Sequence, residues 1–141
     1  MGISNYDISS TLATSVSQRL VRRLCPECST KRELTQEEKK LINDISNRYN
    51  VKFNNKDNTI SEAQGCSKCN YTGYFDRIGI FEVLVLNDEI KEAISNDKSS
   101  IEIKKIALEQ GEYKPLIVDG IRKVLEGITT FEELNRKIVL Y

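Results

Sequence analysis

The chain has 141 residues, of which 39% are apolar and 30% charged, and its 21 Lys and Arg residues balance its 21 Asp and Glu residues. The length suits one ordinary domain, or one domain with a small metal-held lobe. A net charge of zero gives no electrostatic reason to expect nucleic acid, and the absence of His excludes Ser-His and Cys-His catalysis. No apolar run reaches the roughly 18–20 residues that span a bilayer, and no secretory signal pattern opens the sequence, so we expect a cytoplasmic chain.

The first segment is predicted to be a helix that ends near Leu24. Apolar residues recur at every fourth position, which would place them along one helical face. These residues are Ile8, Leu12, Val16, Leu20 and Leu24. Ser4 followed by Asp7 resembles a capping box at the start of this helix. Pro26 disfavours helical backbone at Cys25, so the helix is expected to stop there.

Residues 25–75 are predicted to differ from the flanking segments, because two Cys-x-x-Cys units bracket a polar stretch. Within this stretch, Thr35 and Glu38 match a second capping box ahead of apolar residues at helical spacing. We therefore expect a helix over about residues 36–49. Residues 50–65 are rich in Asn, Lys and Ser and are predicted to form a loop with one short strand.

The remaining residues predict one strand followed by short helices. Arg77–Leu86 is dense in Ile, Val and Phe and is the clearest β-strand in the sequence. Capping and stop signals then predict helices over about 88–94, 99–111 and 115–127 and a last one that begins after Thr130.

The four cysteines predict a structural zinc site. They are Cys25, Cys28, Cys66 and Cys69. Two residues between paired thiols allow both sulfurs to reach one ion from a tight turn, and two such turns complete a tetrahedron. Four thiolates fill the coordination sphere, so no metal-bound water is expected and the site would be structural rather than catalytic. The predicted fold class is thus α+β, with mostly short helices, a small tetracysteine zinc-knuckle lobe and one clear β-strand.

The same cysteine spacing admits three other sites. Disulfides are disfavoured in a cytosolic chain, and a redox Cys-x-x-Cys normally stands alone beside a strand–helix unit. Spacing alone leaves an iron–sulfur cluster open.

Residues around the cysteines are candidates to support the metal. Backbone N–H groups and nearby cations could offset the net charge of a tetrathiolate zinc site, although the cations could equally be solvated surface charges. The candidate cations are Arg22, Arg23, Lys31, Arg32 and Lys68. Glycines expected to permit tight turns around the metal are Gly65, Gly73 and Gly79. Aromatic residues expected to pack over the second knuckle, rather than to stack on nucleic acid bases, are Tyr71, Tyr74 and Phe75.

Three ordered blocks of the sequence resemble the type II secretion and type IV pilus assembly ATPases. The first is Ser17–Cys28, which leads into the first cysteine pair. The second is Gly65–Tyr74 followed by Arg77–Leu84, and the third is Asp119–Glu133. The resemblance covers nearly the whole chain and implies the carboxy-terminal end of a motor subunit.

This resemblance implies three segments. Residues 1–24 would be the last helix of a nucleotide-binding core, 25–75 a tetracysteine zinc-binding lobe, and 76–141 a strand plus a carboxy-terminal helical subdomain. It also implies a full-length parent that binds ATP and Mg²⁺, forms a hexamer, and acts through an inner-membrane platform protein, which would place it in the cytoplasm, peripheral to the inner membrane.

Sequence motifs for ATP hydrolysis are missing from the chain. There is no G-x-x-x-x-G-K-[ST] phosphate loop, no acidic motif for Mg²⁺ activation, and no counterpart of the family's histidine motif. The chain itself is therefore expected to be non-catalytic, with the zinc lobe as a structural and docking element.

Two further functions remain as alternatives. A free-standing zinc-ribbon module for nucleic acid is suggested by the knuckles and adjacent Arg residues, but the zero net charge disfavours it. A dithiol redox protein would show reversible thiol oxidation and weak metal binding. Under the zinc interpretation, replacing Cys25 or Cys66 by Ser should unfold residues 25–75 while the helices of 88–141 survive.

Overall fold

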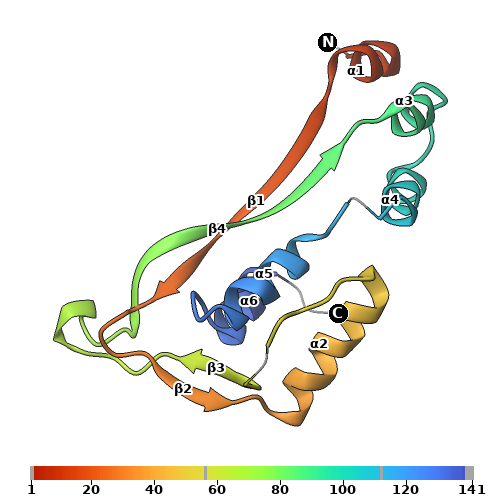
Figure 1. Cartoon of the computed structure of the whole chain (residues 1–141). Coiled ribbons are helices and arrows are strands. Elements are labelled where there is room, and N and C mark those ends of the chain that lie inside the picture. The colour runs from red at the N-terminus through yellow and green to blue at the C-terminus, as the bar shows by residue number, and fades with distance from the viewer. Residues whose placement is uncertain (1, 56, 112, 139–141) are drawn as a thin grey trace. The chain divides into compact units, whose positions relative to one another are not determined.

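The computed structural model describes residues 2–55, 57–111 and 113–138 (Figure 1). The chain divides into two compact units. The first unit comprises Met1–Ser17 and Glu82–Pro115, and the second comprises Gln18–Phe81 and Leu116–Tyr141. Both contain helices and extended segments, so the predicted α+β fold class is confirmed.

The amino-terminal segment departs from the prediction. A short helix α1 (Asn5–Thr11) begins at the expected Ser4 cap, but a strand, β1 (Thr14–Leu24), replaces the predicted helix that was to end near Leu24. β1 pairs with β4 (Tyr74–Val85), which begins earlier than the predicted strand and ends one residue before Leu86. The structure therefore contains further strands beside the one that the sequence clearly predicts.

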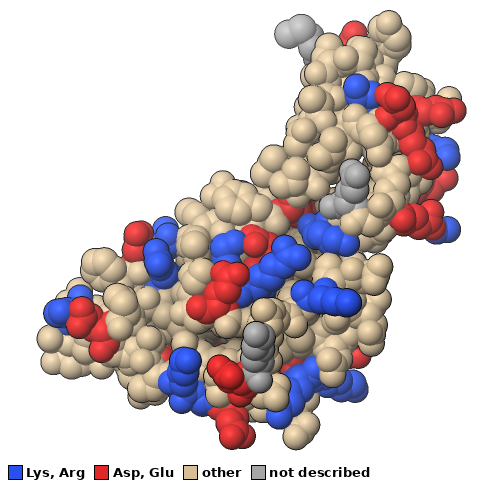
Figure 2. All heavy atoms as spheres, viewed as in Figure 1, with Lys and Arg blue, Asp and Glu red and all other residues tan. Residues whose placement is uncertain are grey.

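The first unit is built from three helices around its own apolar core. α3 (Asp88–Ser95) contacts both α1 and α4 (Ser100–Glu109). The buried residues of this core are Leu86, Ile90, Ala107 and Tyr113. On the face that Figure 2 shows, acidic side chains gather over α3 and α4.

The second unit surrounds a larger core. β2 (Thr30–Glu33) pairs antiparallel with β3 (Thr59–Glu62), with Thr30 opposite Glu62. α2 (Gln36–Tyr49) connects them, and α5 (Leu116–Leu125) lies against β3 and α6 (Phe131–Lys137). Core residues that come from both the cysteine-bracketed segment and the last two helices include Leu34, Ile45, Ile60, Ile121 and Leu134. These two regions are therefore one packed structure.

Helix starts follow the capping signals in the sequence. Thr35 and Ser99 form complete capping boxes with Glu38 and Glu102, which begin α2 and α4. Thr130 caps α6 by accepting a hydrogen bond from the Glu133 N–H group. These caps are local side-chain-to-backbone bonds, so the sequence predicts them well.

Replacing Thr35 by Ala should lower the free energy of unfolding by about 1 kcal/mol, the usual value of a helix cap. The Thr35 hydroxyl accepts from the Glu38 N–H group at 3.2 Å, and Glu38 accepts in turn from the Thr35 N–H group at 2.9 Å. Denaturant unfolding monitored by circular dichroism measures the loss. Thr35→Ser keeps the hydroxyl and should restore most of it, and equal losses in both variants would contradict the capping role.

Candidate metal centre

The four cysteine sulfurs lie together in one cluster. All four Sγ atoms are within 4.8 Å of one another. The Sγ atoms of Cys25 and Cys66 are 3.9 Å apart, and those of Cys28 and Cys69 are 3.8 Å apart. A regular tetrahedron with metal–sulfur distances of about 2.3 Å has sulfurs about 3.8 Å apart. The spacing therefore fits a single tetrahedral ion, and it is far longer than a disulfide bond of about 2.05 Å.

Local backbone geometry brings the two cysteine pairs together. Cys25 follows the last residue of β1, and its N–H group donates to the carbonyl of Gly73 at 3.0 Å. Cys66 precedes the short 3₁₀ helix η1 (Ser67–Cys69), which contains Cys69. Gly73 has φ +76°, and a Cβ there would lie 2.7 Å from the Cβ of Ala63. The knuckle therefore requires glycine at this position.

The predicted roles of the three glycines hold for two of them. Gly65, like Gly73, has a positive φ, and a Cβ on it would meet the Tyr71 carbonyl oxygen at 2.7 Å. Gly79 instead lies within β4, where a Cβ would meet the side chains of Phe81 and Gln18. The absence of a side chain at Gly79 thus serves packing beside the strand rather than a turn around the metal.

Backbone N–H groups point at the sulfurs. Cys69 Sγ accepts from the N–H groups of Cys66 at 3.2 Å and Gly73 at 3.3 Å. Cys28 Sγ accepts from the Gly65 N–H group at 3.3 Å. Such bonds stabilise thiolate charge, as the sequence analysis expected of the knuckle backbone.

The thiols differ in their tendency to ionise. Burial alone would raise the pKa of Cys69, but the hydrogen bonds from Cys66 and Gly73 outweigh it and lower the pKa to about 6. Burial raises the pKa of Cys28 to about 12, and hydrogen bonds with the other cysteines reinforce this. Without a metal, Cys69 therefore ionises more readily than Cys28. A bound divalent cation would displace the Cys28 proton.

Most of the candidate cations are engaged away from the sulfurs. Arg32 pairs with Glu38 at 2.7 Å and Arg22 with Glu133 at 2.8 Å. Lys68 pairs with Glu27 at 2.9 Å across the two knuckles. The backbone N–H groups, rather than these side chains, are the direct partners of the sulfurs.

The aromatic residues near the second knuckle do not cover it as predicted. Tyr71 is 77% exposed and Phe75 is 60% exposed, so these two expectations are wrong. The Tyr74 ring lies against the Arg22 guanidinium group, and the Tyr74 and Thr130 hydroxyl groups form a hydrogen bond at 2.9 Å. Cys25 and Cys69 are themselves buried, and the apolar core of this segment comes from Leu34, Ile45 and Ile60.

The loop between α5 and α6 clasps the strand that leads into the first cysteine pair. Leu24 N–H donates to the Ile128 carbonyl at 2.8 Å, and the Thr129 hydroxyl donates to the Arg22 carbonyl at 2.8 Å. A Cβ on Gly127 would lie 2.8 Å from Ser61 Oγ on β3. The cysteine cluster is thus tied to the loop between the last two helices by contacts that no local sequence signal reveals.

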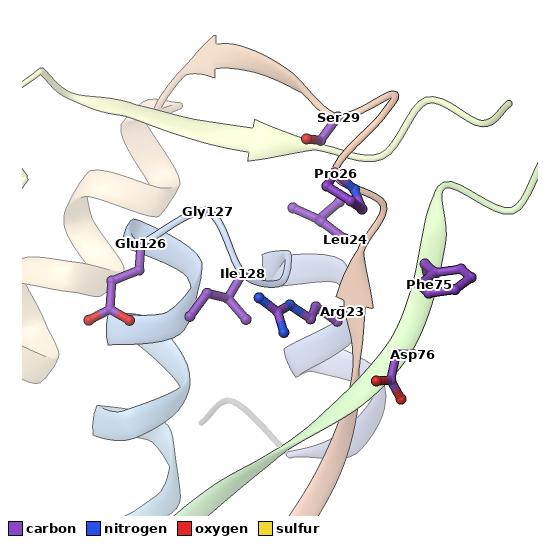
Figure 3. A pocket seen from close by; sticks show the side chains of 9 residues that line it. All are labelled: Arg23, Leu24, Pro26, Ser29, Phe75, Asp76, Glu126, Gly127 and Ile128. Atoms are coloured by element: carbon purple, nitrogen blue, oxygen red, sulfur yellow. The ribbon is translucent and has the colours of Figure 1, made fainter. Parts of the chain in front are cut away.

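A separate pocket of about 460 Å³ opens beside the first knuckle (Figure 3). Pro26 and Ser29 line it from the knuckle, Phe75 and Asp76 from β4, and Ile128 from the clasping loop. Its walls mix apolar and charged side chains and include none of the cysteines. The pocket is therefore separate from the cysteine cluster.

A buried carboxylate is the main feature that sequence reasoning missed. Glu133 accepts hydrogen bonds from the Arg22 N–H group at 3.1 Å and from Arg22 Nε at 2.8 Å. Its side chain is 1% exposed. The sequence alone predicts only that Glu133 lies in the first turn of a capped helix.

Comparison with known proteins identifies the family. Residues 1–136 match the family described as "Type II/IV secretion system protein". The chain is 40% identical, over 149 aligned positions, to the type IV pilus assembly ATPase PilB of Thermus thermophilus, covering 99% of this chain and 15% of that protein. It is 35% identical, over 138 positions, to the type II secretion system protein E of Aeromonas hydrophila, covering 96% of this chain and 25% of that protein.

A third relative, the type II secretion system ATPase E of Vibrio cholerae, is 35% identical over 136 positions, with 96% of this chain and 25% of that protein covered. The chain thus spans a quarter or less of the length of these relatives. None of the helices in the described residues has the length and apolar character needed to cross a membrane. The three ordered sequence blocks and these matches agree, and the chain belongs to the type II/IV secretion system protein family.

Proposed function

We propose that Cys25, Cys28, Cys66 and Cys69 hold one structural Zn²⁺ ion. The observation that carries this proposal is the set of four sulfurs at close to tetrahedral spacing. All-thiolate ligation suits zinc, and four protein ligands leave no open position for substrate or water. N–H groups from Gly65, Cys66 and Gly73 offset part of the thiolate charge.

We further infer that the chain is a non-catalytic structural and docking module from the carboxy-terminal end of a hexameric ATPase that powers type II secretion or type IV pilus assembly. Family membership and the names of the relatives support this. In this proposal ATP and Mg²⁺ bind only in the full-length parent, because this sequence has no phosphate loop. In this proposal residues 1–24 complete the nucleotide-binding core, 25–75 form the zinc lobe, and 76–141 form the strand and helical subdomain.

The partners of such a module are the other motor subunits and an inner-membrane platform protein, in the cytoplasm at the inner membrane. The pocket beside the first knuckle, with mixed apolar and charged walls, offers a surface suited to protein contacts. Nucleic acid is not expected as a partner, because the net charge is zero.

Metal analysis of the purified chain under reducing conditions tests the zinc proposal. We expect one zinc per chain, no visible absorption from an iron–sulfur cluster, and loss of secondary structure by circular dichroism when a chelator removes the ion. Four titratable thiols in a chain that keeps its fold without metal would overturn the proposal and favour the dithiol redox alternative.

A further inference from the structure

A small pocket in the second unit gathers positive charge. It has a volume of about 190 Å³ and is distinct from the pocket beside the knuckle. Its lining residues are Leu20, Arg22, Arg77, Glu133, Arg136 and Lys137. Four cations therefore face a single carboxylate. Like charges this close repel one another unless an anion lies among them.

The carboxylate is already occupied and cannot neutralise the pocket. Glu133 Oε2 accepts from Arg22 Nε at 2.8 Å and lies 3.5 Å from Arg136 Nη1, and Glu133 Oε1 accepts from the Arg22 backbone. The Glu133 side chain is buried, so its bonds to Arg22 and Arg136 fix the positions of both guanidinium groups at the inner wall of the pocket. The arrangement positions Arg22 and Arg136 and leaves part of their donor capacity open to the pocket.

The other two cations have no partner of this kind. Within the described part of the chain, the side chains of Arg77 and Lys137 make no hydrogen bond or ion pair. Arg77 lies on β4 and Lys137 at the end of α6, so two elements distant in sequence bring their free charges to one place. Both side chains are exposed and accessible to a ligand.

We propose that this basic pocket binds a phosphate group. Guanidinium groups match the geometry of phosphate oxygens and donate two parallel hydrogen bonds to them. After the Glu133 charge is subtracted, three positive charges remain, which a phosphate near −2 balances better than one carboxylate does. The pocket is smaller than the roughly 300–1,000 Å³ of sites for larger ligands, which suits a single phosphate group.

The site includes none of the cysteines. Loss of phosphate binding in a variant that keeps its zinc content therefore separates failure of this site from failure of the zinc proposal. The phosphate group could be free inorganic phosphate or the terminal group of a nucleotide, and the two sources share the chemistry that the pocket would recognise.

Isothermal titration of the full metal-loaded chain with inorganic phosphate, at constant ionic strength, tests the proposal. The variant Arg77→Gln/Lys137→Gln removes the two unpaired cations and leaves Glu133 with its partners. A control, Arg48→Gln/Lys52→Gln, removes the same charge from exposed positions outside the pocket. We expect saturable binding by the wild type and the control, and at least tenfold weaker binding by the pocket variant.

A nucleoside diphosphate titrated in parallel separates the two sources. Tighter binding than phosphate, lost in the pocket variant, assigns the site to a nucleotide phosphate, and weaker or equal binding assigns it to the free ion. The proposal is overturned if the wild type shows no saturable phosphate binding, or if the pocket variant binds phosphate as well as the control does. It is also overturned if acetate displaces phosphate at equal concentration, which would mark a carboxylate site. Unchanged zinc content and thermal midpoint confirm that the variants remain folded.

Discussion

Replacing Cys25 by Ser is expected to abolish stoichiometric zinc binding and to unfold the second unit as a whole. Structural zinc contributes about 10–16 kcal/mol of apparent binding free energy in zinc-held peptides, comparable with the total stability of about 5–15 kcal/mol of a domain. Cys25 is buried and directly follows the strand clasped by the α5–α6 loop. Since Ile60 and Ile121 share one core, loss of the lobe should also expose α5 and α6.

This expectation revises the one drawn from sequence, which had all helices of 88–141 surviving. Hydrogen exchange with mass spectrometry, together with zinc analysis, measures the outcome. Protection should fall in α5 and α6 but persist in α3 and α4, which have a core of their own. Cys66→Ser should behave in the same way, whereas Ser67→Ala, an exposed change in the same knuckle, should retain the metal. Full zinc content and stability in the Cys25→Ser variant would refute the structural role.

Replacing Glu133 by Ala should lower the free energy of unfolding by about 2–4 kcal/mol. Removing one member of a buried ion pair leaves its partner uncompensated, at a cost of about 3–5 kcal/mol. We place the loss somewhat lower because the Arg22 side chain is 33% exposed and water can solvate it in part. Denaturant unfolding measures the difference. The neighbouring exposed residue supplies a matched control, and Glu132→Ala should change stability little.

The same carboxylate predicts a pH dependence. Burial would raise the pKa of Glu133, but hydrogen bonds from the Arg22 side chain and backbone prevail and hold it below the usual value. A group with a lowered folded-state pKa stabilises the fold above its unfolded pKa of about 4.3 and loses that contribution as pH falls through the folded value. Wild-type stability should therefore drop below about pH 4 more steeply than that of Glu133→Gln. If the free energy of unfolding fell equally with pH in the wild type and in Glu133→Gln, this linkage would be ruled out.

The missed strand β1 shows why periodicity alone can mislead. A repeat of four residues fits one face of a helix, but it also fits one face of a strand, because four is a multiple of two. Leu12, Val16 and Leu20 follow this repeat, yet they are exposed, Val16 by 57%. Val21, which is fully buried, lies outside the repeat, and Leu24 is the buried member of the repeat in β1. Pairing with β4, invisible in the local sequence, decides the structure of this segment.

Local signals predict most of the helices and the clustering of the four cysteines far better. Helices α2, α4 and α6 each have a cap whose side chain bonds to backbone three residues away, so a few neighbouring residues specify them. The cysteines are equally local in pairs, and zinc chemistry supplies the rule that joins the pairs. No local rule predicts the buried ion pair of Glu133, because its partner Arg22 lies 111 positions away in the sequence. The polar strand β2 was likewise unrecognisable without β3.

The two cysteine knuckles also bear on the order in which the chain folds. Cys28 and Cys69 are 41 positions apart, so bringing them together closes a loop at an entropic cost of about 3 kcal/mol. Helix α2 lies inside that loop and carries its own capping box, so it can form before the loop closes. The proposed zinc ion would then act as a removable cross-link between the two ends of this partly ordered segment. Refolding with metal present begins from a restricted ensemble, whereas the metal-free chain must search for the same contact by diffusion.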